Sequence, residues 1–302
     1  MATIPCPALL RRLIALLLAA LLMAGCSNAK TPPAPPARVA LWTISDNSGV
    51  RGWLLSTVHA LPPETVWRRA EIDTALGAAD RLVLEIGEPL DSTVAGEALG
   101  RLAFTAGLPP PSARITPDEA RALGKVYKEL SLSDDGFKNQ ESWAVALQLA
   151  AIAAEKQGID PESGVEPKLR EMAGAKPITG LETIDSQFAI FDALPDRAQQ
   201  VLLGEVAREA ADSRDDERDV MELWLRGDDL GIARESMTGF LADPQLREAL
   251  LTRRNSAWTA KIDALLKAGA RPFIAVGAAH LAGSEAVQRM LAARGWRIAR
   301  VP

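Results

Sequence analysis

The chain contains two histidines, His59 and His280, and each follows an apolar run typical of a buried strand. Two glutamates occupy comparable positions, because Glu85 ends such a run and Glu182 follows a short one. In open α/β sheets, ligands gather at the carboxyl ends of the strands. We therefore expect these four side chains to share one site.

The chemistry of this set admits two hydrolytic mechanisms. Two imidazoles and two carboxylates could bind a divalent metal such as Mn, Co or Zn, whose bound water becomes a hydroxide nucleophile near neutral pH. The expected metal ligands are His59, Glu85, Glu182 and His280. The same side chains could instead work without metal, with a glutamate activating water and a histidine shuttling the proton. Taken singly, each histidine would more often be structural, and each glutamate could equally form a salt bridge or cap a helix.

Two further polar residues, Arg254 and Asn255, fall in the middle of a predicted helix. Solvent exposure is the ordinary expectation for such an arginine. If Arg254 faces the site instead, its guanidinium would clamp a carboxylate or stabilise an oxyanion. The sequence has no Gly-x-Ser-x-Gly elbow, His-Glu-x-x-His helix, P-loop or Gly-x-Gly-x-x-Gly motif, so no organic cofactor is expected.

Strands that could position these residues are predicted toward both ends of the chain. Two β-branched and aromatic runs separated by a polar turn cluster indicate a hairpin, over 39–44 and 52–58. Further apolar runs predict strands at 81–86, 177–180, 272–276 and 296–301. A helix over 284–294 lies between the last two, so the chain would end in a strand–helix–strand unit of the βαβ type.

Helical patterns fill the middle of the chain. A proline pair at Pro62 and Pro63 predicts a helix start, and long alanine-rich helical stretches run over 92–173 and then up to residue 266. The fold class predicted for residues 39–302 is therefore α/β, with a central mixed sheet flanked by helices and a large helical insertion.

The first 26 residues have the features of a secretory signal. Arg11 and Arg12 precede an apolar run that is shorter than a membrane-spanning helix and closes on small residues before Cys26. This ending resembles the bacterial lipobox, although Met23 stands where leucine is usual, and it predicts a lipid on Cys26 that binds the membrane. A plain signal peptide that releases a periplasmic protein is the alternative. Residues 27–38 follow as a proline-rich linker.

Composition excludes several kinds of function. The only cysteines are Cys6 and Cys26, so the folded body has no disulfide, thiolate ligand or cysteine nucleophile. The formal net charge of the whole chain is −5, and removal of the signal would take away two arginines and no acidic residue. Nucleic acid is therefore not an expected partner, because phosphate binding relies on a basic surface.

An ordered set of short motifs resembles the TraB/PrgY/GumN family, which includes the animal TIKI proteins. The motifs are Leu55-Ser56-Thr57-Val58-His59, Leu82-Val83-Leu84-Glu85, Gly180-Leu181-Glu182-Thr183 with Gln187, Arg254-Asn255-x-x-Trp258, and Gly277-Ala278-Ala279-His280. The resemblance implies an α/β fold akin to erythromycin-esterase-like and ChaN-like proteins, with two Gly-x-x-His motifs in one site. TIKI proteins are metal-dependent proteases that favour manganese or cobalt, whereas many bacterial members have no established substrate.

Carried over by motif, the resemblance implies site roles for His59, Glu85, Glu182, Arg254 and His280, and it adds Asn255 and Glu166. Two departures stand out. Ser56 replaces the first motif glycine, which would restrict the backbone before His59, and Glu166 replaces the usual aspartate.

These features predict a hydrolase of the bacterial cell envelope, lipid-anchored facing the periplasm or secreted into it. We expect it to be metal-dependent and protease-like, acting on a peptide or other acyl bond. The alternatives are a metal-free esterase-like hydrolase and a non-catalytic envelope protein that binds a peptide or polysaccharide.

Overall fold

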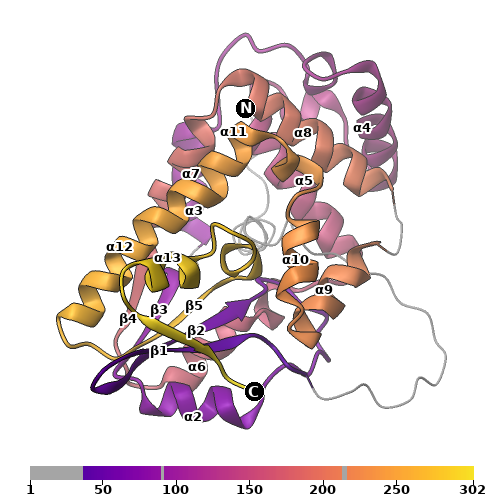
Figure 1. Cartoon of the computed structure of the whole chain (residues 1–302). Helices are drawn as coiled ribbons and strands as arrows, with labels where there is room; N and C mark the ends of the chain where they lie inside the picture. Colours follow the sequence, from indigo (N-terminus) through magenta and orange to yellow (C-terminus); the bar gives the residue numbers. More distant parts are fainter. Residues whose placement is uncertain (1–36, 90–91, 213–215) are drawn as a thin grey trace, which may run out of the picture.

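The computed structural model describes residues 37–89, 92–212 and 216–302 (Figure 1). The signal peptide predicted over 1–26 lies outside the described residues, as does nearly all of the linker predicted over 27–38. Within the described part of the chain, no helix is both long enough and apolar enough to span a bilayer.

The centre of the fold is a six-stranded sheet with the order β4-β3-β5-β2-β1-β6. Its strands are β1 (Leu41–Asp46), β2 (Gly49–Thr57), β3 (Arg81–Ile86), β4 (Ile178–Glu182), β5 (Pro272–Gly277) and β6 (Arg297–Arg300). β1 pairs antiparallel with β2 and β6, whereas β2, β5, β3 and β4 are mutually parallel. The predicted mixed sheet is confirmed. Four parallel strands place their carboxyl ends at one edge.

The core has two layers, one on each face of the sheet, because successive side chains of a strand point to opposite faces. On β2, Leu55 packs with Trp224 and with the buried residues of α2 (Ala70–Ala78) and α6 (Val165–Ala173). Its neighbour Leu54 packs on the other face against α12 (Arg253–Lys267) and α13 (Val287–Ala293). Helices therefore cover both faces of the sheet (Figure 1).

Helices of the predicted insertion occupy two stretches, before and after β4. Before it are α3 (Ser92–Leu102), α4 (Pro117–Leu130), α5 (Ser142–Lys156) and α6. After it are α7 (Ile184–Asp192), α8 (Asp196–Ala211), α9 (Asp216–Arg226), α10 (Asp229–Glu235), α11 (Pro244–Arg247), a π-helical turn over Glu248–Thr252, and α12. Residues of α4, α5, α7 and α8 form a separate apolar cluster, which lies beyond the carboxyl edge of the sheet (Figure 1).

Two predicted helix starts are wrong. The helix expected from Pro62 begins only at Ala70, and Val66 is 80% exposed. The intervening chain is not helical: it makes a turn at 63–64, where Thr65 N–H donates to the Pro62 carbonyl. Leu61 bridges to Asp160, and Trp67 packs near Trp224 with ring centroids 6.4 Å apart.

The other helix, expected from residue 284, begins at Val287. Contacts with α12 hold Glu285 in place of a first helical turn. The Glu285 carbonyl accepts a hydrogen bond from Asn255 at 2.8 Å, and its carboxylate accepts one from Thr252 at 2.9 Å.

Candidate active site

The structure brings all five predicted site residues together at the carboxyl edge of the parallel strands. His59 follows β2, Glu85 lies near the end of β3, Glu182 ends β4, and His280 lies in a 3-10 turn after β5. A side-chain carbon placed on Gly277 would lie 3.1 Å from Glu85 Oε1, 3.3 Å from His59 Nε2 and 3.7 Å from His280 Cδ2. The two histidine rings and Glu85 therefore converge on one point.

His59 is held by a carboxylate from α6. Its Nδ1 lies 3.0 Å from Glu166 Oε1, which also accepts a hydrogen bond from the Thr57 hydroxyl. The start of α6 lies against the His59 loop, and a side-chain carbon on Gly164 would come within 2.0 Å of the His59 carbonyl oxygen. With Nδ1 bound to Glu166, the ring presents Nε2 to Glu85 Oε1 at 3.8 Å.

His280 is held in the same manner by an amide. Its Nδ1 lies 2.6 Å from Asn255 Oδ1, while Asn255 Nδ2 donates to the Glu285 carbonyl. Because Asn255 uses its amide hydrogens elsewhere, its oxygen accepts from the ring and the proton of His280 lies on Nδ1. His280 Nε2 then accepts from Arg254 Nη1 at 3.3 Å, and the ring packs on Trp258 with centroids 4.3 Å apart.

Arg254 is the central cation of the site rather than an exposed helix residue. Its Nη2 donates to Glu85 and Glu182, each at 2.9 Å, and its Nε donates to Glu182 at 3.0 Å. Its Nη1 donates to the Leu250 carbonyl at 3.2 Å and to His280. A guanidinium has five N–H groups. All five form hydrogen bonds within the protein, so Arg254 holds the Glu85 and Glu182 carboxylates in place and offers no free donor to a ligand.

The ionisation of these groups follows from burial and neighbouring charge. Burial lowers the pKa of His280 to about 3, with the positive charge of Arg254 acting in the same direction, so the ring is neutral. Burial alone would raise the pKa of Glu85. The positive charges of His280 when protonated, Arg254 and His59, and the N–H of Gly277, lower it to about 2.

His59 has the opposite balance to His280. Burial on its own would lower the pKa of His59, but the charge of Glu166, the hydrogen bond to it and the charge of Glu85 together raise that pKa above its usual value. The site thus contains one neutral imidazole, His280, and one, His59, that stays protonated to a higher pH than a free histidine.

The four predicted metal ligands do not fit a metal ion while Arg254 is in place. Both oxygens of Glu182 accept from Arg254, and Oε1 also accepts from Trp258 Nε1 at 2.9 Å. Glu85 bonds Arg254 and the Gly277 N–H, at 2.9 and 2.7 Å. The guanidinium lies between Glu85, Glu182 and His280. Across the described ranges, no three His, Cys, Asp or Glu side chains are grouped so as to hold a metal.

The two motif positions before the histidines differ in what they require. Ser56 lies in β2 with its backbone hydrogen-bonded to Ala40, and its φ is not positive, so serine is compatible with the backbone there. The loop restriction expected from Ser56 is therefore not observed, although its hydroxyl is buried and finds no hydrogen-bond partner among the described residues. Gly277 leaves little space for a side chain, because an added carbon would contact Glu85 and His59 closely enough that they would have to shift slightly.

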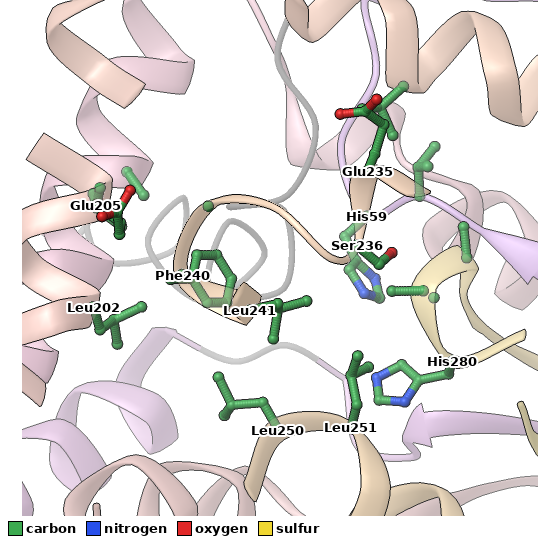
Figure 2. Close-up of a pocket in the computed structure, with 18 of the residues that line it drawn as sticks. His59, Leu202, Glu205, Glu235, Ser236, Phe240, Leu241, Leu250, Leu251 and His280 are labelled. Carbon is green, nitrogen blue, oxygen red and sulfur yellow. The ribbon is translucent and has the colours of Figure 1, made fainter. Parts of the chain in front are cut away.

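A cavity of about 510 Å³ opens beside the histidines. Figure 2 shows His59 and His280 on one wall, Leu202 and Glu205 on the opposite wall, and Phe240 with Leu241 between them. Apolar side chains from α5, α7, α8 and the π-helical turn contribute much of the lining, including Leu147, Phe191, Leu202, Val206, Leu250 and Leu251. The sheet edge and the helical insertion therefore share one cavity.

Several cavity residues carried no role in the sequence interpretation. Glu205, Glu209 and Glu235 line it, and no motif marks them because their position depends on how α8 and α10 pack. Gln187, which belongs to the motif that contains Glu182, is buried and lines the same cavity. Its spacing of five residues after Glu182, on the helix that follows β4, was the available signal.

Comparison with known proteins gives a family and two similar sequences. Proteins named uncharacterized protein YbaP, from Escherichia coli and from Shigella flexneri, are each 29% identical over 180 residues, which is 59% of this chain. The match covers 66% of each relative, slightly less than two thirds of its length. No solved structure matches. The profile of the TraB/PrgY/gumN family matches residues 40–300, which include every site residue described above. The chain belongs to the TraB/PrgY/gumN family.

Proposed function

We propose that this protein is a hydrolase of a peptide or other acyl bond. One observation carries the proposal: His59, anchored through Nδ1 by Glu166, presents Nε2 beside the Glu85 carboxylate on the wall of a cavity. An imidazole oriented in this way can take a proton from a water molecule, as general bases of hydrolases do. The reaction would join that water to the acyl carbon and release an amine or an alcohol.

The other residues would support this step by fixing charge. Glu85 stays ionised and orients the water, because the surrounding positive charges keep its pKa low. Arg254 neutralises Glu85 and Glu182, and His280 stays uncharged beside it. These contacts hold the groups in place before substrate arrives, as electrostatic catalysis requires.

A metal-dependent hydrolase is the second candidate, and one observation favours it. Both imidazoles are held through Nδ1 with Nε2 turned inward, which is the usual arrangement of metal-binding histidines. A manganese, cobalt or zinc ion would draw on His59, Glu85 and His280, and Arg254 would have to release its hydrogen bonds to Glu85 and His280 first.

The test uses the mature protein purified without a histidine tag and a panel of peptides and esters. Hydrolysis by the wild type that survives chelation and is lost in His59→Ala supports the metal-free reaction. The second candidate is supported if the wild type binds a stoichiometric amount of metal, His59→Ala does not, and adding the metal restores the activity of the chelated wild type. Ligand binding without hydrolysis, in either form, would instead identify a non-catalytic peptide- or polysaccharide-binding protein.

We further propose that the protein acts in the bacterial cell envelope, through a lipid on Cys26. The signal-like segment and the cysteine at its end support this location. Labelled palmitate should enter the wild type and not Cys26→Ser, and the variant should move from the membrane to the soluble periplasmic fraction. Unlabelled wild type would overturn the lipid anchor.

A further inference from the structure

We propose that Gln187 donates a hydrogen bond to the carbonyl oxygen of the substrate, whose bulky apolar acyl group fills the adjoining cavity. This inference rests on the proposed hydrolase function and specifies its substrate class. Four steps lead to it.

The side-chain amide nitrogen of Gln187 is buried and unpaired among the described residues. The residue is only 4% exposed. A buried donor left unsatisfied costs about 1–3 kcal/mol, and the great majority of buried polar groups are paired. Because Gln187 also lines the cavity, a ligand there is the natural acceptor.

A substrate carbonyl in this site would need an N–H group that is not already bonded within the protein. The N–H groups of Arg254 are all engaged, and His280 uses its ring proton for Asn255. The oxyanion role considered for Arg254 would therefore have no free N–H to perform it. Gln187 lines the cavity that also contains His59, and its amide nitrogen is unpaired among the described residues.

The third step is the position of Gln187 in the fold. α7 begins two residues after Glu182, and its first turn is fixed by a capping box between Thr183 and Ser186. Gln187 donates its backbone N–H to the Thr183 carbonyl at 3.0 Å, so it lies one turn into a well-anchored helix. The side chain is thus carried by the same strand-to-helix connection that delivers Glu182 to the site.

The fourth step is the lining of the cavity. Phe191 lies one turn further along α7, and Leu147, Leu202 and Leu250 add apolar surface from three other elements. A volume of about 510 Å³ is in the range of small-molecule sites and suits an aromatic or branched aliphatic group. Carboxylates in the same lining disfavour anionic ligands. The expected substrates are neutral or cationic amides or esters with a bulky apolar acyl group.

Gln187→Met removes the donor and keeps the length of the side chain, and the exposed Gln245→Met is the matched control. We expect kcat on apolar amides and esters to fall by about 10²–10³-fold with a much smaller change in KM, as for loss of an oxyanion donor. The melting temperature of Gln187→Met should equal or exceed that of the wild type, because an unpaired buried donor is removed. A lowered melting temperature with unchanged kcat would show a structural role and overturn the inference.

A binding measurement separates this inference from the proposed function. Titration of N-acetyl-phenylalaninamide into the wild type should show binding that Gln187→Met weakens by about 3- to 10-fold, the size of one hydrogen bond. The anionic N-acetyl-phenylalanine should bind less tightly than the neutral amide. If the wild type hydrolyses nothing yet binds in this pattern, the hydrolase proposal fails and the binding role of Gln187 stands. Equal binding by both proteins, or none by the wild type, overturns it.

Discussion

At the scale of single residues, Arg254 links Glu85 and Glu182 to His280. Arg254 is 8% exposed and forms ion pairs with the carboxylates of Glu85 and Glu182. Its contribution to the stability of the fold therefore differs from that of a surface arginine. Exposed ion pairs contribute about 0–1 kcal/mol, whereas removing one partner of a buried pair costs about 3–5 kcal/mol.

Replacement of this residue should therefore destabilise the whole protein. We expect Arg254→Met to lower the melting temperature by about 10 °C, because Glu85 and Glu182 would be left without a cation in a buried site. Thermal unfolding followed by circular dichroism measures the change. The neighbouring Arg253→Met is the control, since the Arg253 side chain is 74% exposed and pairs with Glu248 at the surface. Equal effects of the two substitutions would contradict the central role of Arg254.

The pairing of His59 with Glu166 makes a second prediction, in the pH dependence of activity. A general base must be unprotonated, so activity should rise with pH as His59 loses its proton, with a midpoint above the usual pKa of about 6.5. Glu166→Gln removes the negative charge that raises the pKa of His59. The acid limb of kcat/KM should then move to lower pH. A limb that stays in place would rule out His59, as held by Glu166, as the titrating base.

At the scale of elements, the strands could be predicted closely and the helix starts less well. The run 81–86 coincides with β3 because its apolar residues are bounded by polar ones. Strand ends in turn fix where His59, Glu85 and Glu182 lie. Helix starts failed where tertiary contacts replace local pattern, as when Trp67 is drawn to Trp224.

The hydrogen bonds of Arg254 and the presence of carboxylates in the cavity could not be predicted from the sequence, for a different reason. Both depend on how the helical insertion packs against the sheet edge, and no short-range pattern records that contact. The sequence placed Arg254 in a helix, but only the packing of α12 on the sheet brings it to Glu85.

The exit of β5 allows a prediction about close approach. Gly277 has φ −53°, which any residue can adopt, so its requirement is spatial. The added carbon of Gly277→Ala would press on Glu85 Oε1 and His59 Nε2 at 3.1 and 3.3 Å. We expect kcat/KM to fall by about 10-fold or more, since small misplacements of catalytic groups are costly, with only a minor loss of stability.

A control for that substitution lies in α4. Gly124 has open space around its Cα, so Gly124→Ala should leave activity unchanged and stabilise the helix by about 0.5–1 kcal/mol. Kinetics and thermal unfolding of both variants make the comparison. Full activity in Gly277→Ala would show that Glu85 and His59 need not hold these positions.

At the scale of the whole molecule, the cavity is where the helical insertion meets the sheet edge. The site groups come from strand ends and α12, whereas the far wall comes from α8 and the chain around Phe240 (Figure 2). Glu209, on α8, lines the cavity from that far wall, although the residue as a whole is exposed. Desolvation of its carboxyl group, and then the negative charge of Glu205, raise the pKa of Glu209 to about 7. Ionising Glu209 therefore opposes the folded state.

The sign of this effect gives a prediction for the stability of the molecule. A carboxyl whose folded pKa exceeds its unfolded value favours folding below about pH 4.5, and that contribution is lost as the pH rises to about 7. Glu209→Gln keeps the shape and cannot ionise, so its melting temperature should exceed that of the wild type at pH 8. Near pH 4 the two proteins should differ little. The exposed Glu64→Gln should show no such pH-dependent difference. If Glu209→Gln gains nothing at pH 8, the carboxyl of Glu209 is fully solvated in the folded protein, and the raised pKa is contradicted.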